Sequence, residues 1–199
     1  MRIGVLAIQG DVREHIVHTE RAGAEAVPVR LVRDIEDTQG LIIPGGESTT
    51  IGMLMAEYGL IDAIQQRAQG GHYPIYGTCA GLILLAKTVI GLSPARLGLV
   101  DIDASRNAYG RQVASFEVDL AVDVLGPEPF PAVFIRAPKI ERMGNGVRPL
   151  AFYQGMPVMA ESGPYLVSAF HPEMSGDIRI HQYFLDKVKR VASVAGASS

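Results

Sequence analysis

The stretch Tyr76-Gly77-Thr78-Cys79-Ala80-Gly81 holds the only cysteine among 199 residues, and it decides the fold. An apolar run, 73–76, leads into it, and a longer apolar run, 82–86, follows it. Glycines two residues before and two residues after Cys79 permit the sharp strand-to-helix turn of a nucleophile elbow, with Cys in place of Ser. Negative charge on the sulfur is favoured at such a helix N-terminus. The stretch therefore predicts either a presented nucleophile or, as the plainer alternative, a small buried apolar side chain.

Composition limits the classes of protein that remain. Nearly half of the residues (48%) are apolar, which suits a sizeable core, and 18 basic against 21 acidic residues leave a net charge of −3. The sequence has no cluster of Lys and Arg residues that would favour a nucleic-acid partner. The apolar start, 1–8, is too short for a signal or a membrane span, and no other apolar run is longer than a core element. A single cysteine excludes an internal disulfide framework, so we expect a cytoplasmic enzyme or binding domain without a membrane partner.

The first half of the chain alternates apolar strands with amphipathic helices, which predicts an α/β fold with a mostly parallel sheet between two helical layers. The expected strands are 3–8, 26–32, 40–43 and 73–76. The expected helices are 12–22, 49–58, 60–68 and 80–87. Asp11 is expected to cap the first helix, and Glu47 or Ser48 the second, while Gly23 and Gly59 end them.

The pattern changes after about residue 98. Residues 113–120 alternate between apolar and polar side chains, which is typical of a half-exposed antiparallel strand. Further strands are expected at 132–135, 147–154, 158–161 and 165–170, so an antiparallel extension follows the parallel core. Asp177 is expected to cap a final helix, and the tail, 192–199, to fray. We expect one domain over 1–199.

A cysteine nucleophile requires a base, and the base requires a group that orients it. The segment His171-Pro172-Glu173 can supply both at the end of a strand. Proline favours an extended conformation at the residue before it, and residues two apart on an extended segment point the same way. Glu173 is therefore expected to bind one nitrogen of His171 and leave the other facing the thiol.

Two backbone N–H groups are candidates for stabilising an oxyanion. The turn Pro44-Gly45-Gly46 follows an apolar strand and leaves its amides uncovered, so Gly46 N–H and Ala80 N–H are the expected donors. The plainer alternative for the glycine pair is a turn followed by a helix cap.

The remaining histidines are interpreted as surface residues; they are His15, His18, His72 and His181. His15 and His18 have a spacing that metal ligands also use, but no further ligand cluster supports a closed site, so no metal is expected.

Several motifs in order give the chain a specific resemblance. They are Gly4–Gly10, Pro44–Thr50, Gly77–Gly81, Arg106-Asn107, Gly110–Gln112, Ser115–Glu117, Phe134–Pro138 and Phe170–Glu173. Together they resemble class I, triad-type glutamine amidotransferases, and more narrowly the PdxT family, the glutaminase subunits of pyridoxal 5′-phosphate synthase. The motifs run from residue 4 to about 185, nearly the whole chain.

The resemblance implies an activity and the residues that perform it. Cys79 would attack the side-chain amide of L-glutamine, form a glutamyl thioester and release ammonia. His171 would move protons, Glu173 would orient it, and water would release glutamate, with no cofactor. Residues that match the family's glutamine-contacting positions are Gly46, Glu47, Ser48, Arg106, Ile135 and Arg136. For the two arginines the plainer alternative is a solvated surface charge.

The resemblance also implies a partner. Ammonia would pass to a separate (β/α)8-barrel synthase subunit that makes pyridoxal 5′-phosphate, within a large heteromeric complex, and the isolated glutaminase would be weak. Rim residues 9–13 and 107–111 are our expected partner contacts. Three alternatives stay open: a glutaminase subunit of another synthase, such as imidazole glycerol phosphate synthase; a non-catalytic module on the same fold; and a stand-alone cysteine hydrolase with another substrate.

Overall fold

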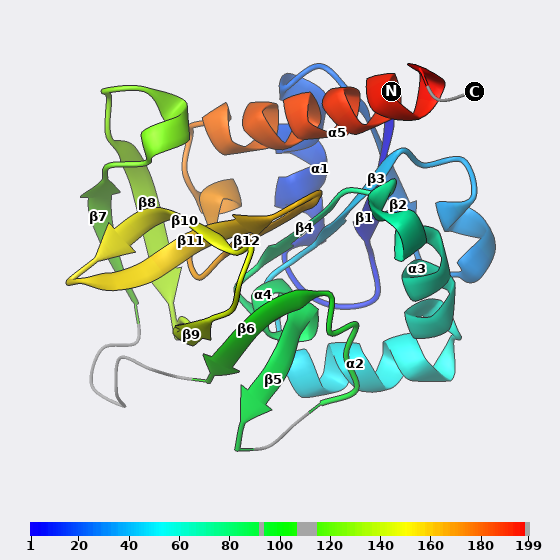
Figure 1. Ribbon diagram of the computed structural model, residues 1–199, viewed down its shortest axis with the longest axis horizontal. Coiled ribbons are helices and arrows are strands. Elements are labelled where there is room, and N and C mark those ends of the chain that lie inside the picture. Colours follow the sequence, from blue (N-terminus) through cyan, green and yellow to red (C-terminus); the bar gives the residue numbers. More distant parts are fainter. Residues whose placement is uncertain (92–93, 107–114, 198–199) are drawn as a thin grey trace.

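The structure, a computed structural model, describes residues 1–91, 94–106 and 115–197. Within these ranges a seven-stranded sheet has the order β10-β11-β12-β4-β3-β1-β2 (Figure 1). The strands from β12 to β2 are parallel, and β11 and β10 extend the sheet in the antiparallel sense. This arrangement confirms the expected α/β class with its antiparallel extension.

The strands of this sheet are short and mostly apolar, as buried parallel strands are. Their bounds are β1 Arg2–Leu6, β2 Glu25–Val29, β3 Gly40–Ile43, β4 Ile75–Thr78, β10 Arg148–Tyr153, β11 Met156–Ser162 and β12 Tyr165–Ser168. Every residue of the central strands β3 and β4 is buried, because helices cover both faces there. The end of β4, where Cys79 follows, therefore lies in the middle of the sheet.

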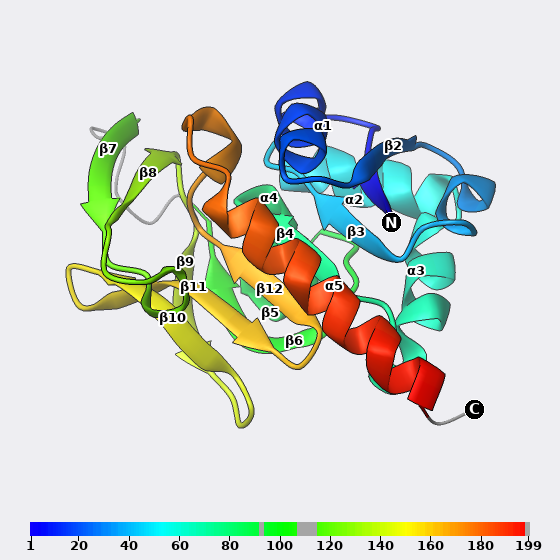
Figure 2. The same cartoon turned by 90° about the horizontal axis from the view of Figure 1, so that it is seen from above.

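Helices form a layer on each side of the sheet. Helix α1 (Val12–Arg21) contacts β1, β2 and α5 (Arg179–Ala197), whereas α4 (Ala80–Leu85) contacts β4, β12 and α2 (Ser48–Glu57). Helix α3 (Leu60–Ala68) packs beside α2, and the two views show α1 and α5 on one side and α2 and α4 on the other (Figures 1 and 2). Four short 3-10 turns are also present in the described ranges: η1 Val32–Ile35, η2 Gln69–Gly71, η3 Asp123–Leu125 and η4 Pro172–Met174.

Two smaller sheets flank the main one. The first contains β5 (Ala86–Ile90), β6 (Val100–Ser105) and β9 (Lys139–Met143), and the second pairs β7 (Ser115–Leu120) with β8 (Phe130–Ile135). The β7–β8 pair is antiparallel, and β7 alternates between exposed and half-buried residues, as expected.

Some boundaries differ from the sequence-based expectation. Strand β3 and helix α3 have the expected bounds, but the expected helix over 80–87 ends at Leu85 and continues directly as β5. The β-branched residues Thr88, Val89 and Ile90 favour the strand. Strands β6 and β9 were not expected at all, and α5 continues to Ala197, through most of the segment expected to fray.

No helix in the described ranges combines the length and the apolar character needed to cross a membrane.

Candidate active site

Cys79 sits in a strained turn between β4 and α4. Its backbone angles, φ 48° and ψ −100°, lie outside the regions that residues other than glycine favour. The backbone N–H of Cys79 donates to Ser168 O at 2.8 Å, which ties the turn to the end of β12. The predicted elbow is thus present.

The glycines of the elbow are required by close packing. A Cβ on Gly81 would lie 2.2 Å from Ile43 O, and a Cβ on Gly77 would lie 2.5 Å from Gly81 O. Both distances are far below van der Waals contact with backbone that cannot easily move. The spacing that drew attention in the sequence therefore lets α4 start directly against β3.

His171 and Glu173 form the expected pair. His171 Nδ1 lies 2.8 Å from Glu173 Oε1, and His171 N donates to Val133 O at 2.8 Å, which fixes the residue against β8. The local conformation differs from the extended segment we expected, because Pro172 and Glu173 belong to the 3-10 turn η4. The turn brings Glu173 back under the imidazole, and both side chains are buried.

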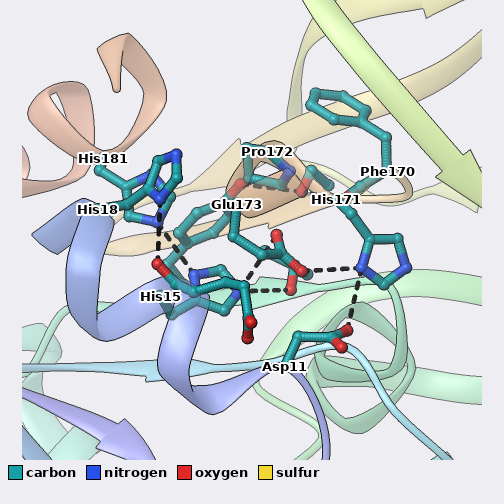
Figure 3. Close-up of polar contacts among 12 residues, drawn as sticks. Asp11, His15, His18, Phe170, His171, Pro172, Glu173 and His181 are labelled. Atoms are coloured by element: carbon teal, nitrogen blue, oxygen red, sulfur yellow. Dashed lines mark hydrogen bonds and ion pairs between the residues drawn. The ribbon is translucent and has the colours of Figure 1, made fainter. Parts of the chain in front are cut away.

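Asp11 contributes a second carboxylate to His171, which sequence analysis missed. Asp11 occupies the N-cap position of α1, but its side chain makes no capping hydrogen bond, so the prediction that it caps this helix is wrong. Asp11 Oδ2 instead lies 3.3 Å from His171 Nδ1 (Figure 3). No local signal distinguishes this use from a cap, because His171 is distant in sequence.

These contacts favour a charged pair at His171 and Glu173. Burial alone would lower the pKa of His171, but its contacts with Asp11, Cys79 and Glu173 outweigh burial and raise it. Burial alone would likewise raise the pKa of Glu173, but His15 and His171 hold it well below its usual range. An imidazolium beside Cys79 is suited to stabilise a thiolate and to donate a proton.

Three of the four histidines interpreted as surface residues are buried, which corrects that prediction. Only 0% of His15, 6% of His18 and 1% of His181 is exposed, while His72 is exposed as expected. Figure 3 shows the buried three beside Glu173, where α1 meets α5. The sequence gives no local sign of this burial, because each ring can lie inside only by finding polar partners from distant segments.

The loop after β3 forms the other wall of the site. Glu47 caps α2, with its carboxylate accepting from Thr49 N at 3.2 Å and Thr50 N at 2.7 Å. Arg106 donates to Glu47 Oε1 at 2.5 Å and to Thr49 Oγ1 at 2.9 Å, so it is not a solvated surface charge. Burial opposes ionisation of Glu47, but these hydrogen bonds lower its pKa to about 2.

A cavity of about 350 Å³ unites these residues. Its lining is Gln9, Gly10, Asp11, Gly46, Glu47, Ser48, Cys79, Ala80, Ile83, Arg106, Ile135, Arg136, Pro138 and His171. Every site residue predicted from the sequence lines this cavity except Glu173, which lies behind His171. Gln9 also contributes to the wall, because its Oε1 accepts from Glu47 N at 2.8 Å. Of the expected rim contacts, 107–111 lie outside the described residues.

A cluster of Asp11, His171 and Glu173 meets the simplest distance requirement for a metal site, with ligand atoms within 4.8 Å of one another. Both carboxylates, however, face the same imidazole nitrogen, Nδ1, as shown in Figure 3. We therefore interpret the cluster as a hydrogen-bonded one.

Comparison with known proteins places this chain in a family. A sequence model of the SNO glutamine amidotransferase family matches residues 5–190. The pyridoxal 5′-phosphate synthase subunit PdxT of Pelotomaculum thermopropionicum is 54% identical over 190 residues, covering 96% of each chain. PdxT of Brevibacillus brevis is 52% identical over 193 residues, covering 97% of this chain and 100% of that one.

Solved structures agree. A crystal structure of a glutamine amidotransferase, 48% identical, superposes with a TM-score of 0.90 over 94% of this chain and 98% of that one. The structure of PurLQS from Thermotoga maritima is 20% identical and has a TM-score of 0.66 over 96% and 95% of the two chains, which shows a common fold. With its fold and sequence in agreement over nearly its whole length, the chain belongs to the SNO glutamine amidotransferase family.

Proposed function

We propose that this protein hydrolyses L-glutamine to L-glutamate and ammonia, and that Cys79, His171 and Glu173 act as its catalytic triad. The observation that carries the proposal is one cavity lined by both Cys79 and His171, with Glu173 bonded behind His171. This order of nucleophile, base and orienting carboxylate is what acyl transfer through a thiol requires.

The steps follow from the positions of these groups. The Cys79 sulfur attacks the carbon of the side-chain amide, and the carbonyl oxygen gains negative charge as the tetrahedral intermediate forms. His171 donates a proton to the leaving nitrogen, and ammonia departs from a glutamyl thioester. Water, deprotonated by His171, then releases glutamate and restores the thiol. Gly46 N–H and Ala80 N–H are our candidates for stabilising the oxyanion.

The cavity offers groups for the amino-acid end of glutamine. Ser48 Oγ is buried and has no hydrogen-bond partner within the described part of the chain, which supports a role in substrate binding. Arg136 is exposed and lines the cavity, and its backbone has a left-handed φ of 44°. Such a conformation costs backbone energy and is found most often at functional sites, which supports a role in substrate binding. Glu47, Arg106 and Ile135 complete the proposed contacts.

The proposed destination of the ammonia is pyridoxal 5′-phosphate synthesis. Relatives about half identical over nearly the whole chain bear the name of that synthase's PdxT subunit, which favours this partner over imidazole glycerol phosphate synthase. We further propose that the partner is a (β/α)8-barrel subunit in a large heteromeric complex, and that docking raises a weak basal activity.

A coupled assay tests the proposal. Glutamate release from glutamine is measured for the wild type and for Cys79→Ala, each with and without the synthase subunit. We expect partner-stimulated release by the wild type and none above background by Cys79→Ala. Retained activity in Cys79→Ala would refute the mechanism. Partner-independent turnover without preference for glutamine would instead indicate a stand-alone hydrolase.

A further inference from the structure

The carboxylate of Glu173 contacts a different imidazole with each oxygen. Oε1 lies 2.8 Å from His171 Nδ1, and Oε2 lies 3.3 Å from His15 Nε2. Neither the Glu173 side chain nor the His15 side chain is exposed to solvent. The second contact has an ion-pair distance, but its direction is too bent for a hydrogen bond to be assigned. Figure 3 shows Glu173 between the two rings.

His15 also reaches the elbow. Its Nε2 lies 3.2 Å from Thr78 Oγ1, and Thr78 is the residue directly before Cys79. His15 comes from α1, Glu173 from η4 and Thr78 from the end of β4. One buried ring thus connects the segment that carries the nucleophile with the segment that carries the base.

The third contact determines which nitrogen of His15 bears the proton. His15 Nδ1 lies 3.0 Å from His181 Nε2, and His181 Nδ1 has no partner among the described residues. If His181 donates from Nε2, His15 accepts at Nδ1 and presents an N–H at Nε2 to Glu173 and Thr78. The opposite arrangement would aim a lone pair of His15 at the carboxylate and bury an unpaired N–H of His181. The first arrangement is favoured because buried N–H groups are rarely left without a partner.

We propose that His15 is a positioning residue for the reaction, which holds the Glu173 carboxylate in the orientation that accepts from His171. The proposal rests on the proposed glutaminase function. His15 does not line the cavity, so it acts through Glu173 and not on the substrate.

The electrostatics of Glu173 agree with this role. Burial raises the pKa of Glu173, and its contacts with His15 and His171 lower it below its usual range. The other titratable groups around this cluster are His171, Tyr76 from β4, His181 from α5 with His18 from α1 beside it, and Asp11 and Cys79 through His171. Without His15, one stabilising contact of the carboxylate is lost while its burial remains.

Three variants separate positioning from general stability. His15→Leu removes the contact to Glu173, and His15→Gln restores a donor. His18→Gln is the matched control, since His18 is a buried histidine one turn along α1 whose nitrogens face the carbonyls of Glu14 and Ser175 instead of Glu173. Glutaminase kinetics are measured in the complex with the synthase subunit from pH 5 to 9.

For His15→Leu we expect kcat to fall about tenfold or more, the size typical of losing a group that orients a reacting one. KM for glutamine should not change. Because Glu173 loses a contact that lowers its pKa, this pKa should rise, and the acid limb of the plot of kcat against pH should move to higher pH. His15→Gln should partly restore both kcat and the position of the acid limb. His18→Gln should change neither of them. A pH profile for His15→Leu that matches the wild type would overturn the proposal.

Two measurements do not depend on the glutaminase function. The first is the rate at which iodoacetamide alkylates Cys79, the only cysteine, measured against pH. The acid limb of this profile should also move to higher pH in His15→Leu. In the wild type, nitrogen NMR should find His15 protonated at Nε2; a proton at Nδ1 would refute the proposal even if the variant does not fold. An inactive wild-type complex with these two results intact would contradict the proposed function alone.

Discussion

Asp11 Oδ2 lies 3.3 Å from His171 Nδ1, although Asp11 directly precedes α1 and would ordinarily cap it. The helix is left without a side-chain cap, and the imidazole gains a second acidic neighbour beside Glu173. A cap is worth about 1 kcal/mol. This position therefore gives up local helix stability and places a negative charge at the wall of the cavity.

Replacing Asp11 with Asn tests the effect of this charge. Asp11 comes first among the contacts that raise the pKa of His171, so the pKa should fall in Asp11→Asn. We expect kcat to fall about tenfold, the equivalent of one charge-assisted hydrogen bond. An NMR titration of the His171 ring measures the pKa. Asp62→Asn, an exposed change in the first turn of α3, is the control. An unchanged His171 titration in Asp11→Asn would contradict the assigned interaction.

The elbow predicts a steric requirement at Gly81. A Cβ there would lie 2.2 Å from Ile43 O, so Gly81→Ala must push α4 away from β3. We expect a loss of about 3 kcal/mol in the free energy of unfolding, as for an overpacked core. A displacement of Cys79 by about 1 Å would also lower kcat about a hundredfold.

Urea unfolding and glutaminase kinetics measure the two effects of Gly81→Ala. Gly176→Ala is the control, because a Cβ at Gly176 meets nothing within 4 Å. It should change the free energy of unfolding by less than about 0.5 kcal/mol. Equal stability for the two variants would show that the approach of α4 to β3 is not close.

Local sequence patterns were sufficient for the parallel core. Apolar runs marked β3 and β4, and left-handed glycines ended α1 and α2 at Gly23 and Gly59 as expected. These features depend on neighbours a few residues away, which is what periodicity and turn chemistry detect. The elbow glycines also belong to this class, because their spacing is local even though the contact with Ile43 is not.

Features that depend on distant partners were missed. His15 pairs with Glu173 and His181, and Asp11 pairs with His171, across more than 150 residues of chain. A lone polar residue in a helix pattern is usually assigned to the surface, because burial is costly without a partner. Nothing local announces that partner. Strand β5 was missed for another reason, because its first residue, Ala86, continues the apolar run of α4.

The cap of α2 should make stability depend on pH. Glu47 has a pKa of about 2 in the folded chain, below its ordinary value of 4.5, so its contribution is present above about pH 4.5 and is lost as pH falls toward 2. About half of the side chain (47%) is exposed, so solvent screens the charge. We therefore expect Glu47→Gln to lower the free energy of unfolding by about 1 kcal/mol at pH 7, which is what a helix cap typically contributes.

Urea unfolding at a series of pH values measures this contribution. The difference between the wild type and Glu47→Gln should narrow between about pH 4.5 and pH 3. Glu57→Gln, at the exposed far end of the same helix, should show no such dependence. A difference that stays constant over this interval would mean that Glu47 is not held as an ionised cap.

Lys187 is expected to anchor α5 to the sheet. Its Nζ lies 2.8 Å from both Glu161 Oε2 and Gly163 O, and only 7% of the residue is exposed. Lys187→Met leaves a largely buried carboxylate with Arg148 and Tyr183 as its remaining partners. Because breaking a buried pair costs more than losing an exposed one, we expect the free energy of unfolding to fall by about 2 kcal/mol at pH 7.

Lys189→Met is the control. It removes the exposed pair with Asp186 and should lower the free energy of unfolding by less than about 0.5 kcal/mol. Urea unfolding compares the two, and equal costs would show that the Lys187 pair adds no more than a surface contact.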